Sequence, residues 1–276
     1  MPASKDLDPY VSARAFYGAE LRRLREAAGL TQDALGELAF CSGAYIGQFE
    51  AAVRQPQPEL SKAFDQVLGS GEHLQRLCRL ARQSKHADYF ADVAELELLA
   101  TTISQYATIH VPGLLQTEAY ARGIIRASLP YAAPAQVESR VRARLDRSLL
   151  LDREDAPEFW AIIHETCFGI LVDSGPTMAA QLTHLRDLAA DHPRVVLQVM
   201  PSSAGPHPLM GGLTIAMTFA DSPPIIYNES AHTGQLIEEP ALVAKYLRSY
   251  DHARAAALSP KASLTLIASA VRTYRP

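Results

Sequence analysis

The segment His164–Phe168, with the sequence HETCF, gathers residue types that could do metal or nucleophilic chemistry. A zinc-binding HExxH helix needs a second His at the fifth position, and Phe168 stands there instead. His164 and Cys167 could supply a base and a thiol, but residues three apart on a regular strand point to opposite faces. We therefore predict no catalytic pair in this segment.

The rest of the chain carries no familiar catalytic signature. It has no GxSxG nucleophile motif, no phosphate-binding glycine loop and no GxGxxG dinucleotide motif. The nine His are scattered without ligand spacing, and the three cysteines, Cys41, Cys78 and Cys167, are far apart and odd in number. We predict reduced thiols, no metal and no cofactor.

The loop Pro201–Gly212, PSSAGPHPLMGG, is the feature most typical of a ligand site. It is rich in Pro and Gly, carries His207 and Met210, and joins two apolar segments, so it could form the mouth of a pocket. A structural turn is the alternative, and core filling is the alternative for each residue of the proposed pocket wall. The candidate substrate-pocket residues are Tyr106, His110, Gln116, Tyr120, Trp160, Glu165, Phe168, His207, Met210, Met217, Tyr227 and Glu229.

The N-terminal part of the chain has the spacing of short helices. Residues 1–13 are predicted to form a loose tail, and residues 14–84 a compact domain of five helices. Gly29 suits a left-handed helix end, while Thr31 and Ser42 suit the N-caps of the second and third helices.

Residues 85–276 are predicted to form a larger α+β domain, a small sheet packed by helices. It is expected to be helical to about residue 155, including DVAELELLATTISQY, and mixed beyond that point. The later segments EFWAIIHE, RVVLQVMP, LTIAMTFA and PIIYNE are β-branched and apolar and are bounded by turn residues, which indicates strands.

A basic stripe runs along the predicted helix AQVESRVRARLDRSLLLDRED. Arg140, Arg144 and Arg147 lie on a different face of this helix from its apolar residues Val137 and Val141. The pattern favours a solvated helix face over a binding site.

Two sets of segments resemble known families. The stretch LRRLREAAGLTQDALGELAFCSGAYIGQFE resembles the repressor-type (Cro/C1-like, XRE) helix-turn-helix family. The segments VPGLLQTEAYAR, VVLQVMPSSAGPHPLMGGLTI and IIYNE resemble the C-terminal domain of unknown function that accompanies it in actinobacterial regulators. The resemblance covers nearly the whole chain from Arg14 and implies a transcriptional regulator, often paired with a small partner protein.

The resemblance also implies roles for single residues. Arg25 and Glu50 match a buried ion pair that ties the first helix to the recognition helix. The base-reading positions hold Gly43, Ala44 and Gln48, and only the Gln48 amide can pair with an adenine edge. A retained DNA interface would use Gln32, Ser42, Gln48 and Arg54.

The charge balance argues against strong DNA binding. The chain has a formal net charge of -4, and residues 14–69 hold 6 basic and 7 acidic residues. Thr31–Glu50 contains three acids and no Lys or Arg. Phosphate neutralisation supplies most non-specific affinity, so this face would repel a duplex. The alternative is that helix N-termini and a few Arg residues suffice for weak binding by a dimer.

Apolar residues replace charged ones at two places where the C-terminal family tends to carry charge. Leu99, in LELLA, takes the place of an acid, and HETCFGILVD lacks the paired Arg that follows the corresponding strand in relatives. If these residues line the interior, its cavity is more apolar; repacking of the core is the alternative.

Three hypotheses follow. The favoured one is a regulator-like protein with a degenerate DNA-reading helix, whose C-terminal domain binds an apolar small molecule as a cofactor-free cyclase of secondary metabolism. The alternatives are a DNA-binding regulator whose C-terminal domain senses a ligand or partner, and a protein-interaction module. We expect a cytoplasmic protein outside the membrane, since no apolar run of 18 residues and no signal-peptide core occurs. A small protein partner and a homodimer are left open.

Overall fold

The computed structural model describes residues 7–83, 89–230 and 233–274. It divides into two compact units, Met1–Leu96 with Phe219–Pro223, and Glu97–Thr218 with Pro224–Pro276. Each unit is described by itself below. The expected domain boundary at residues 84 and 85, and residues 1–6 of the expected tail, lie outside the described residues.

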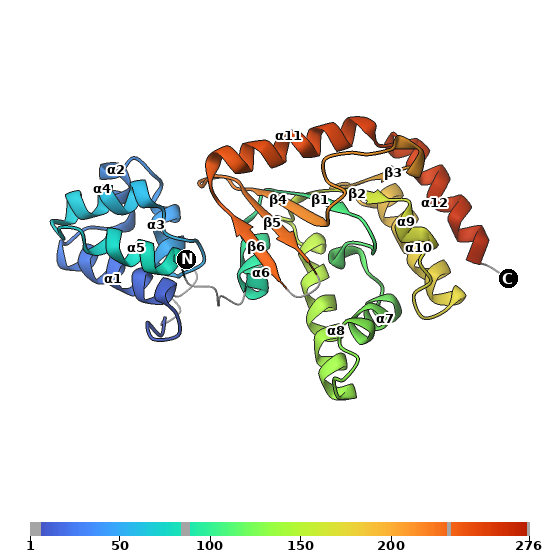
Figure 1. The fold of residues 1–276 in the computed structure, drawn as a ribbon, viewed down its shortest axis with the longest axis horizontal. Coiled ribbons are helices and arrows are strands. Elements are labelled where there is room, and N and C mark those ends of the chain that lie inside the picture. The colour runs from blue at the N-terminus through green and yellow to red at the C-terminus, as the bar shows by residue number, and fades with distance from the viewer. Residues whose placement is uncertain (1–6, 84–88, 231–232, 275–276) are drawn as a thin grey trace. The chain divides into compact units, whose positions relative to one another are not determined.

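Helices account for the first unit up to residue 83 (Figure 1). They are α1 (Ala13–Ala27), α2 (Gln32–Leu38), α3 (Gly43–Glu50), α4 (Pro58–Leu68) and α5 (His73–Gln83). A further helix, α6 (Tyr89–Leu99), contains the boundary between the units. Thr31 Oγ1 accepts a hydrogen bond from Ala34 N at 3.1 Å and Ser42 Oγ one from Tyr45 N at 3.1 Å, so each caps the helix that follows it.

An apolar core holds the five helices of the first unit together. Leu21 of α1, Leu35 of α2 and Phe64 of α4 are fully buried, together with Ile46 and Phe49 of α3. The Phe49 and Phe64 rings meet edge to face at 6.3 Å between centroids. The third helix is therefore fixed by its apolar side, and its opposite side is left for any partner.

The second unit is built on a mixed sheet flanked by helices (Figure 1). Its strands are β1 (Thr102–Ala107), β2 (Glu158–His164), β3 (Val195–Met200), β4 (Leu213–Thr218), β5 (Ile225–Glu229) and β6 (Gly234–Ile237). Its helices are η1 (Gly113–Leu115), α7 (Glu118–Ser128), α8 (Pro134–Ser148), η2 (Leu149–Asp152), α9 (Thr166–Gly169), α10 (Gly175–Asp191), η3 (Ser202–Ala204), α11 (Pro240–Ala256) and α12 (Pro260–Tyr274).

The strand order within the described residues is β3-β2-β1-β4-β5-β6. Strands β1, β2 and β3 run parallel to one another, and β1 pairs antiparallel with β4, which begins an antiparallel half. The predicted fold class, an all-α helix-turn-helix domain followed by a larger α+β domain, is confirmed.

The alternation of side chains gives the sheet two different faces. On one, which we call the α11 face, Tyr106 and Ile162 pack on Tyr250 of α11, and Ile226 packs on Val243 of the same helix. The residues between them along each strand point to the opposite side, which we call the α8 face. Figure 1 shows α11 along one side of the sheet and α8 projecting from the other.

The prediction that the chain is helical to about residue 155 is wrong over β1. Residues Thr102–Ala107 form the central strand between β2 and β4, although the sequence DVAELELLATTISQY was expected to be one helix. The β-branched Thr102 and Ile103 favour a strand, and pairing on both sides satisfies the backbone there. Strand β6 was also not predicted, because it has only four residues and begins at Gly234.

Candidate functional site

Arg25 and Glu50 join α1 to the recognition helix α3. Arg25 Nε lies 2.5 Å from Glu50 Oε1 and Nη2 lies 3.0 Å from Oε2, in the two-pronged geometry that guanidinium groups favour. Gln32 Nε2 donates to the same carboxylate at 2.8 Å. The side chain that was expected to touch phosphate is therefore engaged inside the helix-turn-helix scaffold.

The two glycines of the recognition helix serve the packing of α2 against α3. A Cβ on Gly43 would lie 1.9 Å from Asp33 Oδ1 and 2.8 Å from the Asp33 backbone nitrogen, and Gly43 is buried. A Cβ on Gly47 would lie 3.3 Å from Gln32 Oε1. Gly43 therefore faces α2, so the structure removes it from the positions that could read bases.

Ala44 and Gln48 are what remains of the expected base-reading set. Ala44 is exposed, and the Oε1 atom of Gln48 has no hydrogen-bond partner in the protein. Because that Oε1 atom is buried and Gln48 is only partly exposed, the side chain would have to turn outward before the acceptor could meet a base edge.

The other two expected DNA contacts are engaged by residues Phe219–Pro223, which belong to the first unit. Ser42 Oγ donates to the Asp221 carbonyl at 2.5 Å. Arg54 Nη2 donates to the Pro223 carbonyl at 3.2 Å, and its guanidinium lies 5.2 Å from the Tyr45 ring centroid and 5.4 Å from that of Phe219. Only 1% of Arg54 is exposed, so this conformation withholds its charge from phosphate.

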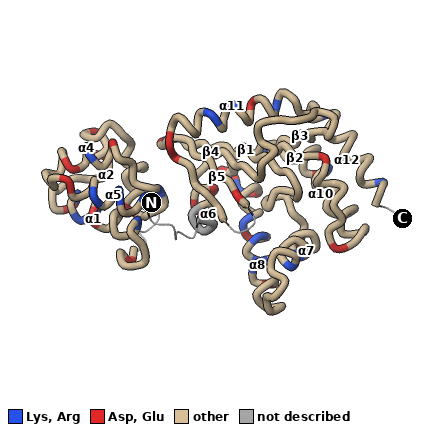
Figure 2. Tube along the Cα trace, viewed as in Figure 1, with Lys and Arg blue, Asp and Glu red and all other residues tan. Residues whose placement is uncertain are grey.

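Charge on the helix-turn-helix surface does not compensate for the buried Arg54. Figure 2 shows acidic and basic residues interspersed over α1–α5 rather than a basic stripe. Asp33 and Glu37 of α2 are exposed beside the recognition helix, while Arg23 is paired with Glu20 at 2.9 Å. A duplex approaching α2 and α3 would meet carboxylates first.

In the second unit, His207 of the predicted loop meets Tyr106 on the α11 face. The backbone N–H of Leu209 donates to His207 Nδ1 at 3.3 Å, so Nδ1 must accept. His207 Nε2 then carries the proton and donates to Tyr106 Oη at 2.8 Å. Burial and the nearby His164 both lower the pKa of His207, which favours this neutral form.

The residues His164 and Cys167 do not act on each other. His164 Nδ1 accepts from Thr166 N at 3.1 Å and from Thr166 Oγ1 at 2.7 Å. Cys167 lies in α9, and its thiol points to the Ala107 carbonyl at 3.9 Å. Burial raises the pKa of Cys167 to about 12, so the thiol stays protonated and is a poor nucleophile.

The predicted pocket residues lie on both faces of the sheet and are not brought together in one place. Tyr106 and Trp160 face α11, whereas Met217 and Tyr227 face α8. His110, Gln116 and Tyr120 are brought together around the Val111 backbone. The remaining predicted residues are scattered: Glu165 accepts from Ser202 N, Phe168 is buried, Met210 is exposed and Glu229 ends β5.

A cavity of about 280 Å³ lies beside the predicted loop, on the α11 face. Pro208, Leu209, Gly211 and Gly212 of the loop form one wall, and mostly polar residues of β4, β5, β6, α11 and the turn between β5 and β6 form the others. Thr214 Oγ1 donates to Asn228 Oδ1 at 3.0 Å, and Asn228 Nδ2 donates to Tyr246 Oη at 2.7 Å. These contacts join Thr214, Asn228 and Tyr246 to one another within the wall.

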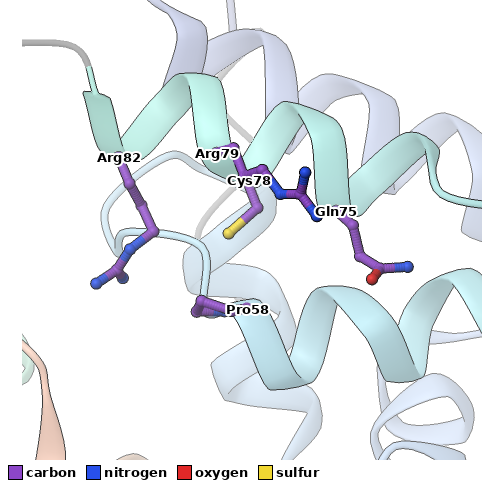
Figure 3. A pocket seen from close by; sticks show the side chains of 5 residues that line it. All are labelled: Pro58, Gln75, Cys78, Arg79 and Arg82. Atoms are coloured by element: carbon purple, nitrogen blue, oxygen red, sulfur yellow. The ribbon is translucent and has the colours of Figure 1, made fainter.

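A second cavity of about 280 Å³ lies in the first unit between α4 and α5 (Figure 3). Figure 3 shows Cys78 directed toward Pro58, with Arg79 and Arg82 along α5. The Cys78 thiol donates to the Pro56 carbonyl at 3.3 Å, and burial raises its pKa. The cavity thus has a satisfied, unreactive thiol on its wall.

Polar side chains gather on the α8 face in a way that the sequence did not reveal, although Gln116 was a predicted pocket residue and Arg144 and Arg147 belong to the basic stripe. Arg147 pairs with Glu97, Arg144 pairs with Gln116, and Gln105 points to the same face; we call these five residues the α8-face cluster. Arg147 Nη2 donates to Glu97 Oε1 at 3.0 Å, and Arg147 Nε lies 2.6 Å from Glu97 Oε2. Burial raises the pKa of Glu97, while the charge of Arg147 acts against that rise.

The cluster corrects the expectation that the basic stripe of α8 is a solvated face. Arg140 is exposed, but Arg144 is partly buried and Arg147 is largely covered. Figure 2 shows the basic residues along α8. Spacing alone did not reveal the cluster, because Glu97 and Gln105 come from α6 and β1, far away in the sequence.

The described residues hold no group of three or more His, Cys, Asp or Glu that could bind a metal ion. Within the same residues, none of the helices is long and apolar enough to cross a membrane.

A helix-turn-helix unit followed along the chain by an α+β unit defines a regulator-like class of protein. A family described as "Helix-turn-helix domain" matches residues 17–78, and a family described as "Domain of unknown function (DUF5753)" matches residues 90–269. The chain belongs to this DUF5753 family, with a helix-turn-helix domain before it, as the resemblance predicted. Comparisons with curated proteins and with solved structures found no match.

Proposed function

We propose that this regulator-like chain keeps a helix-turn-helix scaffold that has lost sequence-specific DNA reading, and that its C-terminal domain binds a small molecule. The observation that carries the first part is the engagement of Gln32, Ser42 and Arg54 by protein groups. Phosphate contacts position such a domain on DNA, and each needs a cation or a donor that is directed outward.

The alternative is a working DNA-binding regulator with a sensing C-terminal domain. The helix-turn-helix match favours it, and so does the Arg25–Glu50 pair, because this pair joins α1 to the recognition helix. The Gln48 amide would then be its base reader. The two functions differ in whether Arg54 touches phosphate, and this can be measured.

Fluorescence anisotropy with a labelled duplex from the region upstream of the gene, and with a shuffled duplex, separates them. We expect equal and weak binding to both, with dissociation constants of roughly 10⁻⁶ M or above at physiological salt. Arg54→Gln should leave the salt dependence of binding unchanged, whereas loss of a phosphate contact would reduce its slope by about 0.9. A preference for the native duplex that Gln48→Ala abolishes would establish the alternative.

The catalytic form of the small-molecule proposal is a cofactor-free intramolecular ring closure of an apolar substrate. The buried Cys167 and Phe168 support an apolar interior at one of the two replaced segments. Leu99, in the other segment, gives no such support, because 49% of it is exposed and it does not line the interior. Incubation with the linear product of a neighbouring synthase cluster tests this form: a rate above that in buffer supports it, and an equal rate removes it.

A further inference from the structure

Arg144 is a partly buried cation that has no carboxylate partner. Its Nη1 donates to the neutral Gln116 Oε1 at 2.9 Å, and the structure gives this described residue no ion pair. Burial first, and the nearby Arg147 second, lower the pKa of Arg144, yet an arginine stays charged at neutral pH. A guanidinium carries five N–H donors, so most of its hydrogen-bonding capacity is unused by the protein.

Its neighbour on the helix shows what a purely structural arginine does here. Arg147, one turn further along α8, is neutralised by the buried Glu97. Withdrawing a charge from water costs free energy unless a partner compensates for it. Arg144 has the neutral Gln116 amide as its partner, and its Nε and Nη2 are not among the buried unpartnered atoms of the described residues, so they stay open to water or to a ligand.

Gln105 is a second unsatisfied group on the same face of the sheet. Its side chain is 2% exposed, and its Oε1 has no hydrogen-bond partner. It points to the α8 face in the row that also holds Ile215 and Tyr227. Arg147 lies close enough to Tyr227 to oppose the rise that burial causes in its pKa. A buried acceptor that has no donor in the protein can accept a hydrogen bond from a bound molecule.

The surroundings hold Arg144 in position. Gln116, which accepts from Arg144, is itself fixed, because its Nε2 donates to the Val111 carbonyl at 2.7 Å. A Cβ on Gly113 would lie 3.9 Å from the Arg144 guanidinium carbon, so the chain before Gln116 passes directly beside it. A donor fixed in this way binds with little loss of side-chain entropy.

We propose that the α8 face carries a binding site for a small molecule with a carboxylate group, which Arg144 pairs with while Gln105 Oε1 accepts an N–H or O–H of the same molecule. The planar fork of arginine matches the two oxygens of a carboxylate. This inference rests on the small-molecule part of the proposed function and is independent of the DNA part.

The charges around Arg144 favour a single negative charge on the ligand. Arg140 and Arg147 act on Arg144 from the same helix, while Glu97 pairs with Arg147 and Glu229 partly offsets the repulsion. Three cations thus face two carboxylates. One carboxylate on the ligand completes the balance, and a dianion would exceed it.

Side-chain ¹⁵N NMR of the full chain tests the site with benzoate and acetate as probes and neutral benzamide as the matched control, at fixed ionic strength. The Nε resonance of Arg144 is identified by its absence in Arg144→Gln. We expect a saturable shift of this resonance with the carboxylates and none with benzamide. Arg144→Lys, which lacks the fork, should bind the carboxylates about tenfold more weakly. Arg142→Gln, at an exposed position of the same helix whose charge is not among those that shift Arg144, should bind as the native protein does.

Absence of a saturable shift with both carboxylates would overturn the site, as would binding that survives in Arg144→Gln. Thermal unfolding provides the second readout. Arg144→Gln should melt within about 2 °C of the native protein, because it removes no ion pair and leaves no buried carboxylate without a cation. A loss as large as that of Arg147→Gln would show that Arg144 serves folding alone and would contradict the proposal. None of these outcomes depends on DNA binding.

Discussion

Arg144 and Arg147 lie one turn apart on α8, yet only Arg147 is paired with a carboxylate. Arg147 closes the contact between α8 and the Glu97 end of α6, where 1% of the Glu97 side chain is exposed. Arg144 instead donates a hydrogen bond to the neutral amide oxygen of Gln116. The same residue type thus has two roles on one helix, and mutation can separate them.

Arg147→Gln should lower the free energy of unfolding of the second unit by about 3–5 kcal/mol, because it leaves the buried Glu97 carboxylate without a cation. Urea unfolding followed by the fluorescence of Trp160, the single Trp of the chain, measures this. Arg140→Gln, at an exposed position, should change the value by less than about 0.5 kcal/mol. Equal effects of the two substitutions would refute the structural role of the pair.

Two glycines of the recognition helix should respond oppositely to alanine. Gly43→Ala should destabilise α2 and α3 by about 1–3 kcal/mol, because the new methyl group meets the backbone of Asp33. Gly47→Ala meets only the end of the Gln32 side chain, which can move, so the better helix propensity should make it neutral or stabilising by up to about 1 kcal/mol.

Hydrogen exchange of the α2 and α3 amides reports both glycine variants without interference from the second unit. Faster exchange in Gly43→Ala and unchanged or slower exchange in Gly47→Ala are expected. If Gly43→Ala exchanged as slowly as the native protein, α2 and α3 would not be packed as closely as the structure places them.

His207 should make the second unit sensitive to acid. The folded-state pKa of His207 lies below its unfolded value, so the unfolded chain binds more protons as the pH falls. The stability that the neutral ring contributes is present above the unfolded pKa of about 6.5 and is lost as the pH falls from that value through the lower folded-state pKa. Protonation would also place a proton on Nδ1, opposite the Leu209 N–H. His207→Gln should therefore flatten the dependence of unfolding free energy on pH between 7 and 5. An unchanged slope would show that other titrating groups cause this dependence.

Local patterns in the sequence were enough to predict the helix-turn-helix fold and the α+β class. The Thr31 and Ser42 caps are local, and the apolar spacing of α1–α5 specifies their buried sides. Strand β1 was mistaken for helix because its apolar and polar residues fit both periods, and only pairing with β2 and β4 decides the outcome.

The α8-face cluster could not be predicted, because it depends on which distant residues meet. The stripe of Arg140, Arg144 and Arg147 was visible, but the sequence does not reveal that Glu97 reaches one of these residues and Gln116 another. The burial of Arg54 was hidden for the same reason, since residues 219–223 lie more than 160 positions away in the chain.

Selection of the full chain against a pool of random duplexes measures whether the helix-turn-helix still distinguishes one DNA sequence from another. We expect no sequence to be enriched over successive rounds at low salt, because Gln48 is the single expected base reader with a suitable side chain, and Arg54 and Ser42 are engaged by the protein. Enrichment of one motif, lost when Gln48→Ala is selected in parallel, would show that the helix-turn-helix still reads DNA and that the proposed loss of reading is wrong.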